Sequence, residues 1–407
     1  MLSVEEALDQ ILSRVSPLPT QHVELMATLG RTLAEPVVSR RELPPWPNSS
    51  MDGYAIRAGD VENGARLRVV GRVVAGSMPS QPVAPGEAIR IFTGAPMPAS
   101  ADAVVPQEDV EVSGDWIEVR QAVEHGAFVR PAGEDIRPGD QLLGPGAVIG
   151  PAEIGLLATL GFSRVRVYRR PRVAILSTGS ELADLGAEPG PGQIPNTNTY
   201  SLMAQVLEAG GEPMNLGVAV DDLSAIEERL AWATSSDVLV SSAGVSVGEL
   251  DFVKEALTRA GAELHLWRVS MRPGKPITFG SLGGRPVFGL PGNPVSAMVT
   301  FELFVRPALL KMLGQRTVER PRLRARALSE IPNPGARRGY LRVRLRADGQ
   351  GWGAELTGNQ GSSVLSSMVM ADGLAVVDPD TVIAAGSPVD VIVLSDLSQI
   401  ASDTARG

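Results

Sequence analysis

Residues 237–296 contain two apolar runs that each end in a glycine-rich loop and resume as a helical pattern. The first reads DVLVSSAGVSVGELD (237–251) and the second reads VFGLPGNPVS (287–296). A buried strand followed by a glycine turn and a helix N-terminus leaves backbone N–H groups directed at one spot, which can hold an anion. Between the loops, MRPGKP (271–276) adds two cations on backbone stiffened by proline. This pattern predicts a site for phosphate or another tetrahedral oxyanion.

The rest of the chain predicts α/β and β regions. Apolar residues at helical spacing open the chain, and short β-rich runs separated by Gly, Pro and Asp follow from about 43 to 140. From residue 172 strand and helix patterns alternate, which is typical of a doubly wound parallel sheet with its ligand site at the carboxyl ends of the strands. After residue 318 the β pattern returns. The predicted fold class is therefore α/β plus β, in several domains.

Composition excludes several kinds of chemistry. The 407 residues include no Cys, so the chain has no thiolate nucleophile, disulfide or Cys-bound metal. It has only three His, none in the glycine-rich loops, so histidine catalysis is not expected. A formal net charge of −9 argues against a nucleic-acid partner. No apolar run is long enough to span a membrane, and acidic residues near the N-terminus do not suit a signal peptide. We expect a cytoplasmic enzyme.

Each polar loop also has a simpler interpretation, as the start of a helix. The segments STGSE (177–181) and SVGE (246–249) have the spacing of a capping box, and the Asn-Pro pair at 293–294 suits a helix cap followed by proline. Capping explains one such loop well. Three loops at the same predicted sheet edge, together with the cationic turn, favour a ligand site.

Acidic residues at this edge are candidates for holding Mg²⁺. They are Glu181, Asp221, Asp222 and Asp251. Magnesium takes oxygen ligands and keeps several waters, so one or two carboxylates suffice. The alternative is that Asp221 or Asp222 caps the helix that follows it.

Nine motifs, in one order along the chain, resemble a single family: LPPWPNSSMDGYA (43–55), IFTGAPMP (91–98), GEDIRPGD (133–140), STGSEL (177–182), SAGVSVGE (242–249), RPGKP (272–276), LPGNPVS (290–296), TGNQGSSVLSSM (357–368) and AGSPVDV (385–391). The chain resembles the MoeA family of bacterial molybdopterin molybdenumtransferases, which is related to the C-terminal domain of gephyrin. From physics alone, the first two motifs would be surface turns.

The resemblance implies a homodimer with four domains and defined boundaries. These are a molybdopterin-binding α/β domain over 170–318 with an N-terminal helix over 1–21 packed on it, a connecting domain formed by 22–41 and 142–169, a β-rich module over 42–141, and a C-terminal β-domain over 319–407.

The implied reaction inserts molybdenum into adenylylated molybdopterin, using molybdate and Mg²⁺ and releasing AMP and molybdenum cofactor. Handover of the product to molybdoenzymes or their chaperones is a further expectation, with no nucleic acid or membrane involved. Two alternatives are a non-catalytic scaffold like gephyrin and a nucleotide-processing enzyme that shares only the α/β domain. The retained acidic and basic residues argue against the first alternative, and the matching flanks argue against the second.

The resemblance also implies roles for individual residues. The catalytic set is Asp52, Thr93, Glu181, Asp222 and Asp251, of which Glu181, Asp222 and Asp251 would position Mg²⁺. In the family, Asp52 and Thr93 would reach the site from the partner protomer. Substrate phosphate, pterin and molybdate would be bound by Thr178, Gly179, Ser180, Ser242, Gly244, Ser246, Gly248, Arg272, Lys275, Pro291, Gly292, Asn293, Pro294, Ser296 and, from the last domain, Arg338.

Two positions depart from the family pattern. Ala243 stands where glycine is usual, and alanine disfavours the positive φ that glycine tolerates. Asn196 stands where the family commonly has an aspartate, so one possible charge is missing near the predicted metal site.

Overall fold

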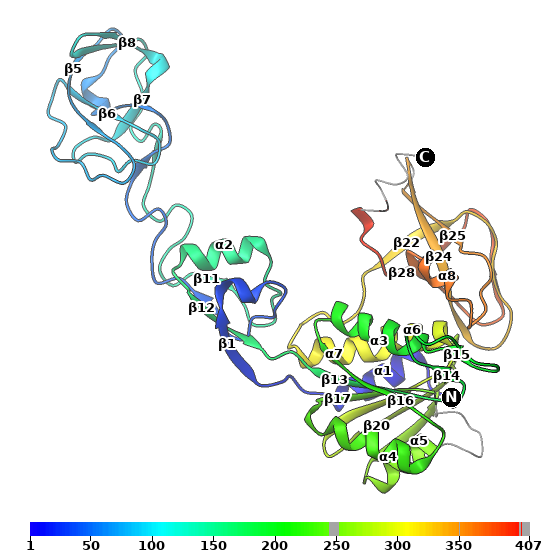
Figure 1. Ribbon diagram of the computed structural model, residues 1–407. Coiled ribbons are helices and arrows are strands. Elements are labelled where there is room, and N and C mark those ends of the chain that lie inside the picture. The colour runs from blue at the N-terminus through cyan, green and yellow to red at the C-terminus, as the bar shows by residue number, and fades with distance from the viewer. Residues whose placement is uncertain (244–251, 350, 399, 401–407) are drawn as a thin grey trace. The chain divides into compact units, whose positions relative to one another are not determined.

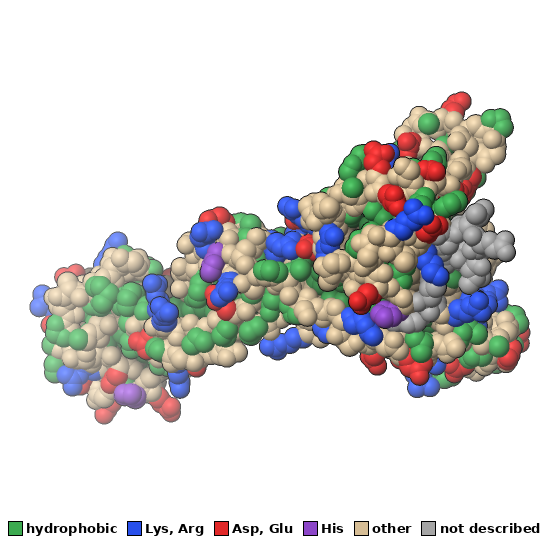
Figure 2. All heavy atoms as spheres, turned by 90° about the horizontal axis from the view of Figure 1, so that it is seen from below, with side chains coloured by type: hydrophobic (Ala, Val, Ile, Leu, Met, Phe, Trp, Pro, Cys, Tyr) green, Lys and Arg blue, Asp and Glu red, His purple; other side chains and the backbone are tan. Residues whose placement is uncertain are grey.

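The computed structural model describes residues 1–243, 252–349, 351–398 and 400 (Figure 1). The chain forms two compact units: Met1–Ala34, Pro145–Ile154 and Ser163–Gly407 make the first, and Glu35–Gly144 and Gly155–Phe162 make the second. Among the described helices, none has the length and apolar character needed to cross a membrane. On the face shown in Figure 2, basic side chains are interspersed with acidic ones.

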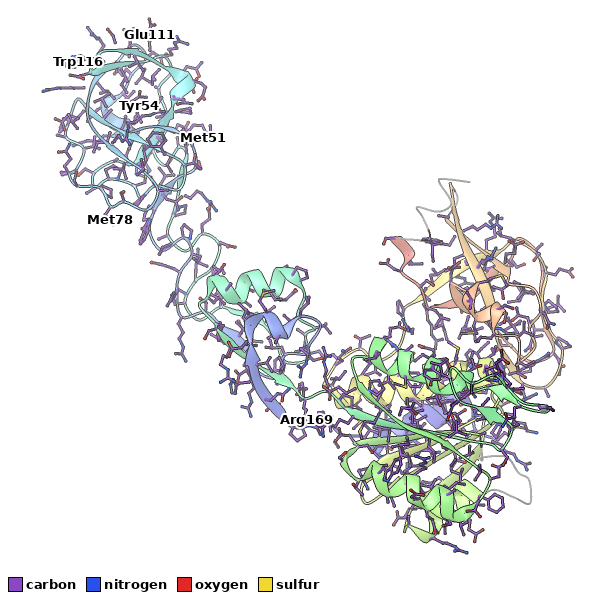
Figure 3. The ribbon with its side chains drawn as sticks, viewed as in Figure 1. Met51, Tyr54, Met78, Glu111, Trp116 and Arg169 are labelled. Atoms are coloured by element: carbon purple, nitrogen blue, oxygen red, sulfur yellow. The ribbon has the colours of Figure 1, made fainter. Side chains whose placement is uncertain are left out.

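The second unit is built on a six-stranded sheet of order β7-β4-β6-β5-β9-β8. Its strands are β4 (Gly53–Ile56), β5 (Arg66–Val73), β6 (Glu87–Ile91), β7 (Ala103–Pro106), β8 (Val110–Ser113) and β9 (Trp116–Val119). Alternate side chains of β4 enter two cores: Tyr54 and Ile56 pack in one and Ala55 in the other. Tyr54 lies inside the unit, whereas Met51, Met78 and Trp116 are exposed (Figure 3).

Short pairs and turns complete this unit and its connections. β2 (Val37–Val38) pairs with β11 (Gln141–Leu143), and β3 (Asn48–Ser49) pairs with β10 (Val129–Arg130). In the first unit, β1 (Thr20–Glu24) pairs with β12 (Arg164–Tyr168). The remaining elements here are η1 (Leu25–Thr28), η2 (Ala58–Asp60), η3 (Gln107–Asp109) and α2 (Pro151–Thr159).

The first unit contains the α/β sheet, of order β16-β13-β17-β21-β20-β18. Its strands are β13 (Arg172–Thr178), β16 (Glu212–Ala219), β17 (Val238–Ser242), β18 (Glu263–Arg268), β20 (Pro276–Leu282) and β21 (Arg285–Leu290). β13, β16, β17 and β21 are parallel, as predicted, whereas β20 runs antiparallel to both β21 and β18, so β18 has the same direction as the parallel strands. Gly283 and Gly284 make this reversal because both have positive φ, which a two-residue hairpin requires.

Helices cover both faces of this sheet (Figure 1). One face carries α1 (Val4–Ser13), α3 (Thr197–Glu208), α6 (Pro294–Thr300), the π-helical η5 (Phe301–Val305) and α7 (Arg306–Met312), packed on alternate residues such as Val173 and Ile175. The other carries α4 (Leu223–Trp232) and α5 (Phe252–Arg259), packed on Ala174 and Leu176. A strand buried on both faces explains the continuous apolar run of β13.

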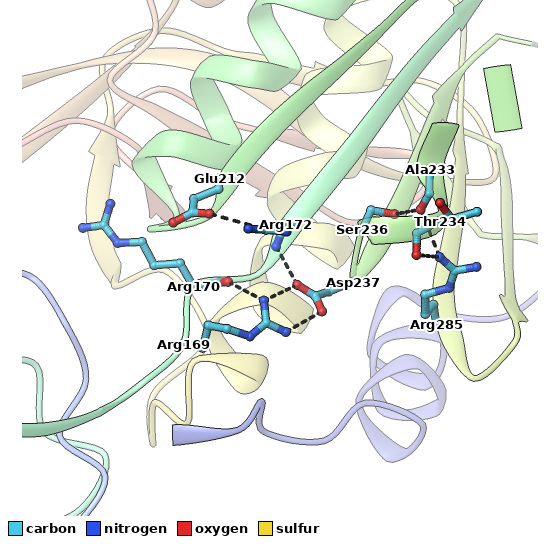
Figure 4. Close-up of polar contacts among 9 residues, drawn as sticks. All are labelled: Arg169, Arg170, Arg172, Glu212, Ala233, Thr234, Ser236, Asp237 and Arg285. Carbon is cyan, nitrogen blue, oxygen red and sulfur yellow. Dashed lines mark hydrogen bonds and ion pairs between the residues drawn. The ribbon is translucent and has the colours of Figure 1, made fainter. Parts of the chain in front are cut away.

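An ion pair fixes the start of β13 against β17. Arg169 donates to both carboxylate oxygens of Asp237 at 2.8 and 2.6 Å, and the backbone N–H of Arg172 donates to the same carboxylate at 2.8 Å (Figure 4). Burial raises the pKa of Asp237, but these hydrogen bonds outweigh burial, so the net pKa is lowered. The two parallel strands therefore start in a fixed register.

The C-terminal sheet, of order β19-β24-β25-β22-β28-β26, closes on itself because β24 also pairs with β26. Its strands are β19 (Met271–Arg272), β22 (Arg322–Ala327), β24 (Arg338–Asp348), β25 (Gly351–Leu356), β26 (Gly373–Val377) and β28 (Pro388–Val393). β19 comes from the α/β region and pairs with β24 in parallel, Met271 opposite Arg338. This pairing brings the predicted cationic turn to the C-terminal sheet. The remaining elements are β14 (Leu182–Ala183), β15 (Ile194–Pro195), η4 (Ala233–Ser235), β23 (Ile331–Asn333), β27 (Thr381–Ile383) and α8 (Ser366–Val369).

Candidate active site

The predicted polar loops meet at one edge of the α/β sheet. β13, β17 and β21 are parallel neighbours, with Ser177 opposite Ser242 and Ser242 opposite Leu290. Their carboxyl ends therefore lie together, as the sequence indicated. Predicted residues Gly244, Ser246, Gly248 and Asp251 lie outside the described residues.

The helix-cap interpretation fails for one of these loops and holds in part for another. The segment 177–181 leads into the short strand β14, not into a helix. Asn293 occupies the N-cap position of α6 and is followed by proline, as that interpretation predicted, but its side chain makes no cap hydrogen bond. Its amide nitrogen instead donates to Ser362 Oγ at 3.0 Å, in the C-terminal TGNQGSS segment. Side-chain capping of a helix therefore does not account for the polar residues of these two loops.

Two adjoining pockets lie at this edge, and the first is cationic. It has a volume of about 650 Å³. We call it the cationic pocket. The residues that line it are Ala243, Arg272, Pro273, Gly274, Lys275, Pro276, Pro291, Gly292, Asn293, Ser296, Arg337, Gln360, Gly361 and Ser362. Among the described lining residues none is a carboxylate, whereas three side chains carry a positive charge. The predicted residues Arg272, Lys275 and Ser296 are brought together here.

A fourth cation, Arg342, lies behind the cationic pocket. Its side chain is fully buried, and it donates to Ser367 Oγ and to the Gly361 carbonyl, each at 3.0 Å. Its Nη1 has no hydrogen-bond partner among the described residues. Burial, with a smaller contribution from the nearby Arg272, lowers the pKa of Arg342 to about 10. The guanidinium therefore stays charged at neutral pH without a carboxylate partner, which favours an anion nearby.

Arg338 is not brought to either pocket. Its guanidinium pairs with Glu5 at 2.7 Å and with Asp378 at 3.3 Å. Arg337 lines the cationic pocket instead, and Arg342 lies behind it. The segment ARRGYLRVR (336–344) is rich in arginine, so the sequence signals a cationic strand without indicating which residues face the site.

The second pocket adjoins the first and shares Ala243, Gly292 and Asn293 with it. We call it the Glu181 pocket; it has a volume of about 520 Å³. Its other lining residues are Thr178, Glu181, Leu182, Ile194, Pro195, Asn196, Thr197, Asn198, Ser242, Pro294 and Ser363. Predicted residues Thr178, Ser242 and Glu181 therefore share one pocket.

The two departures from the family pattern have clear local structures. Ala243 does adopt a positive φ, of 71°, so alanine accepts the conformation that glycine favours. Asn196 is buried, caps α3 by accepting from Thr199 N–H, and donates to Thr199 Oγ1 at 2.9 Å. Its amide is thus engaged within the fold.

The carboxylates predicted for magnesium differ in the contacts that they make. Asp222 caps α4 by accepting from the Ala225 N–H at 3.0 Å, as the alternative interpretation predicted. Asp221 approaches the Ser180 N–H at 3.4 Å. Within the described ranges, no group of three or more Asp, Glu, His or Cys side chains is placed to hold a metal ion. Magnesium binding therefore stays a prediction, and we assign it no protein ligand set.

In the second unit, Asp52 and Thr93 form one polar contact. Asp52 Oδ1 accepts from both the N–H and the hydroxyl of Thr93, each at 2.8 Å. These bonds, the backbone one foremost, lower the pKa of Asp52, and Arg90 adds to the effect. Arg90 itself lies over the rings of Tyr54 and Phe92, at 4.8 and 5.1 Å. The carboxylate is thus held ionised and oriented.

Comparisons with known proteins agree with this architecture. Residues 2–161 match the MoeA N-terminal region (domain I and II), residues 174–311 match a probable molybdopterin binding domain, and residues 324–394 match the MoeA C-terminal region (domain IV).

Relatives match over nearly their whole length. A molybdopterin molybdenumtransferase of Nostoc sp. is 38% identical over 97% of this chain and 94% of its own. A molybdopterin molybdenumtransferase of Haemophilus influenzae is 35% identical over 93% of this chain and 95% of its own. The crystal structure of a molybdopterin biosynthesis MoeA protein from Pyrococcus horikosii has a TM-score of 0.84 at 33% identity, covering 97% of this chain and 100% of that one. The chain belongs to the MoeA family of molybdopterin molybdenumtransferases.

Proposed function

We propose that the protein transfers molybdenum from molybdate into adenylylated molybdopterin, with release of AMP and molybdenum cofactor. The observation that carries this proposal is the cationic pocket, whose described lining residues include three cations and no carboxylate. Family membership supports it, since the curated relatives are named molybdopterin molybdenumtransferases.

The cationic pocket suits a tetrahedral dianion. Molybdate offers only oxygen acceptors, so its binding depends on positive charge and on N–H and O–H donors. Arg272, Lys275 and Arg337 of the lining supply charge, and the buried Ser296 supplies a hydroxyl. Arg342 adds a charge from behind the Gly361 backbone. This set would hold molybdate beside the substrate.

The Glu181 pocket would hold the pterin. It directly adjoins the cationic pocket, so a substrate whose pterin lies in the Glu181 pocket would extend its phosphates toward the cationic pocket. Cleavage of the phosphoanhydride needs positioning and charge neutralisation rather than a nucleophilic side chain. A chain without cysteine is compatible with that chemistry.

We include Mg²⁺ as a requirement of the reaction, because the resemblance implies it. A bound Mg²⁺ would supply positive charge that offsets the negative charge of the substrate phosphates. The residues of this chain orient the substrate and exclude water around it.

We also propose that the active protein is a homodimer in which Asp52 and Thr93 of one copy complete the site of the other. The support is the carboxylate of Asp52, which Thr93 orients through one of its two oxygens, Oδ1.

The test is molybdenum-cofactor formation from adenylylated molybdopterin, with and without molybdate and Mg²⁺. We expect product and AMP in equal amounts only when both are supplied. Binding of the substrate without turnover would indicate a scaffold. AMP release that does not depend on molybdate would indicate a nucleotide-processing enzyme.

A further inference from the structure

Asn198, in the first turn of α3, joins the two neighbouring loops of the α/β sheet. Its amide nitrogen donates to Ser242 Oγ at 2.6 Å and to the Gly292 carbonyl at 2.7 Å. A carbonyl only accepts hydrogen bonds, so the nitrogen of the amide must face Gly292. The oxygen of the same amide is thereby fixed on the opposite side.

That oxygen has no partner in the fold. Asn198 Oδ1 is buried and makes no hydrogen bond with any described residue. The hydroxyl of Thr178, a residue only 2% exposed, is also buried without a partner among the described residues. Unsatisfied buried polar atoms are destabilising and uncommon. Both residues line the Glu181 pocket, so a ligand there would supply the missing partners.

The carboxylate of Glu181 is held against Gly179. A Cβ on Gly179 would lie 2.5 Å from Glu181 Oε2, so any larger residue would displace the carboxylate. Gly179 also has a φ of 144°, which side chains rarely adopt. No described residue hydrogen-bonds or pairs with this carboxylate, and Glu181 is the one carboxylate among the described residues that line the pocket. Leu182, Ile194 and Pro195 add apolar surface suited to a flat ring.

We propose that Glu181 and Asn198 recognise the pterin ring and determine specificity for it. A pterin carries an N3–H and a 2-amino group side by side, and a carboxylate accepts from both at once. Asn198 Oδ1 accepts from the second N–H of the 2-amino group. Adenine offers no such pair of adjacent donors, because its amino group neighbours a ring acceptor. The inference rests on the proposed function and assigns Glu181 to the pterin in place of the metal.

The charged side chains of the cationic pocket do not suit this recognition. They are donors, as are the N–H groups of the pterin edge. The two pockets therefore divide the substrate, with the anions in one and the donor edge of the ring in the other.

The experiment uses two fluorescent probes, pterin and lumazine, which differ in that lumazine has a carbonyl in place of the 2-amino group. Each is titrated into the full-length protein without Mg²⁺. We expect the wild type to prefer pterin, and Glu181→Gln to weaken pterin binding about 10- to 100-fold with little change for lumazine. Asn198→Ala should weaken pterin binding by about 2- to 10-fold with little change for lumazine. Glu228→Gln, on the exposed side of α4, is the matched control and should change neither.

The failures are distinguishable. Equal affinity of the wild type for both probes, or a preserved preference in Glu181→Gln, would overturn the inference. A Glu181→Gln variant with normal pterin affinity and a raised Mg²⁺ half-saturation would also overturn it, by assigning Glu181 to the metal. Molybdenum insertion by the wild type is measured in parallel. If the wild type inserts molybdenum but Glu181→Gln keeps the preference for pterin over lumazine, only the inference fails. If the wild type does not insert molybdenum, the proposed function fails. Thermal melting confirms that each variant is folded.

Discussion

Asp52 accepts two hydrogen bonds from Thr93 through a single oxygen, Oδ1, so its other oxygen is not used by this contact. The residue lies in a turn before β4, and its pKa is lowered by the Thr93 bonds. We expect Asp52→Ala to fold normally and to lose most molybdenum insertion activity, because a turn substitution costs little stability. Steady-state rates and melting temperature check this. Asp60→Ala, an acidic residue in η2 of the same unit, should keep full activity.

A shared active site makes a further prediction for mixtures of variants. If Asp52 completes the site of a second copy, mixing Asp52→Ala with Lys275→Ala should restore part of the activity, because one site in each heterodimer is intact. The measurement is the rate in heterodimers verified by tag-based purification. Inactive heterodimers would show that each site is built from one chain.

Lys275 lines the cationic pocket, and its side chain is exposed to solvent. We expect Lys275→Ala to raise the molybdate half-saturation at least tenfold while binding of adenylylated molybdopterin changes much less, because molybdate binding depends on charge. Lys275→Arg should recover only part of the affinity, since a planar guanidinium does not reproduce a compact ammonium. Rates titrated against molybdate decide the question. Arg344→Ala is the control, and an unchanged half-saturation in Lys275→Ala would remove this residue from the site.

Arg342 is a buried charge whose pKa is lowered to about 10, chiefly by burial. A shift of this size means that burying the charge costs roughly 3 kcal/mol. Arg342→Met should therefore be within about 1 kcal/mol of wild type in unfolding free energy, or more stable, while its stabilisation by molybdate disappears. Urea unfolding with and without molybdate measures both quantities. A variant that is several kcal/mol less stable and still stabilised by molybdate would assign Arg342 to the fold alone.

Ala243 has a φ of 71°, which costs a non-glycine residue roughly 1–2 kcal/mol. Glycine relieves this strain but adds entropy to the unfolded chain. We expect Ala243→Gly to raise the unfolding free energy by about 0.5–1 kcal/mol, measured by urea unfolding. Ala209→Gly is the matched control at a negative φ of −75°, and it should lower stability. Destabilisation by both variants would contradict strain at Ala243.

Tyr340 is 2% exposed, and burial raises its pKa to about 12 from an ordinary value of 10.0. The folded protein holds this proton more tightly than the unfolded chain does. Its contribution to stability is thus complete below about pH 10 and is lost as the pH rises through 12. When the pH is raised from 9 to 11.5, the unfolding free energy of the wild type should fall by roughly 2 kcal/mol more than that of Tyr340→Phe. Urea unfolding at both pH values tests this, with Tyr200→Phe, an exposed phenol, as the control that should behave like wild type.

Local sequence patterns determined much of this protein. Apolar runs followed by glycine-rich loops predicted β17 and β21 and the meeting of their carboxyl ends, because parallel neighbouring strands end at the same edge. The segment 271–276 between the loops predicted cations beside them, and both of its charged residues line one pocket. The β pattern of the second unit also followed from short runs and turns. These features depend on residues close together in the chain.

Only the tertiary structure decided which polar side chains reach the site. Asp222 has a local partner in the α4 cap, and Arg338 has a distant one in Glu5, so neither lines the pockets. Arg337 and Arg342 reach the site because β19 pairs with β24 across some 66 residues of chain. Asn198 joins loops that lie 44 and 94 residues away from it. Such contacts depend on strand register and on competing partners, and a linear pattern encodes neither directly.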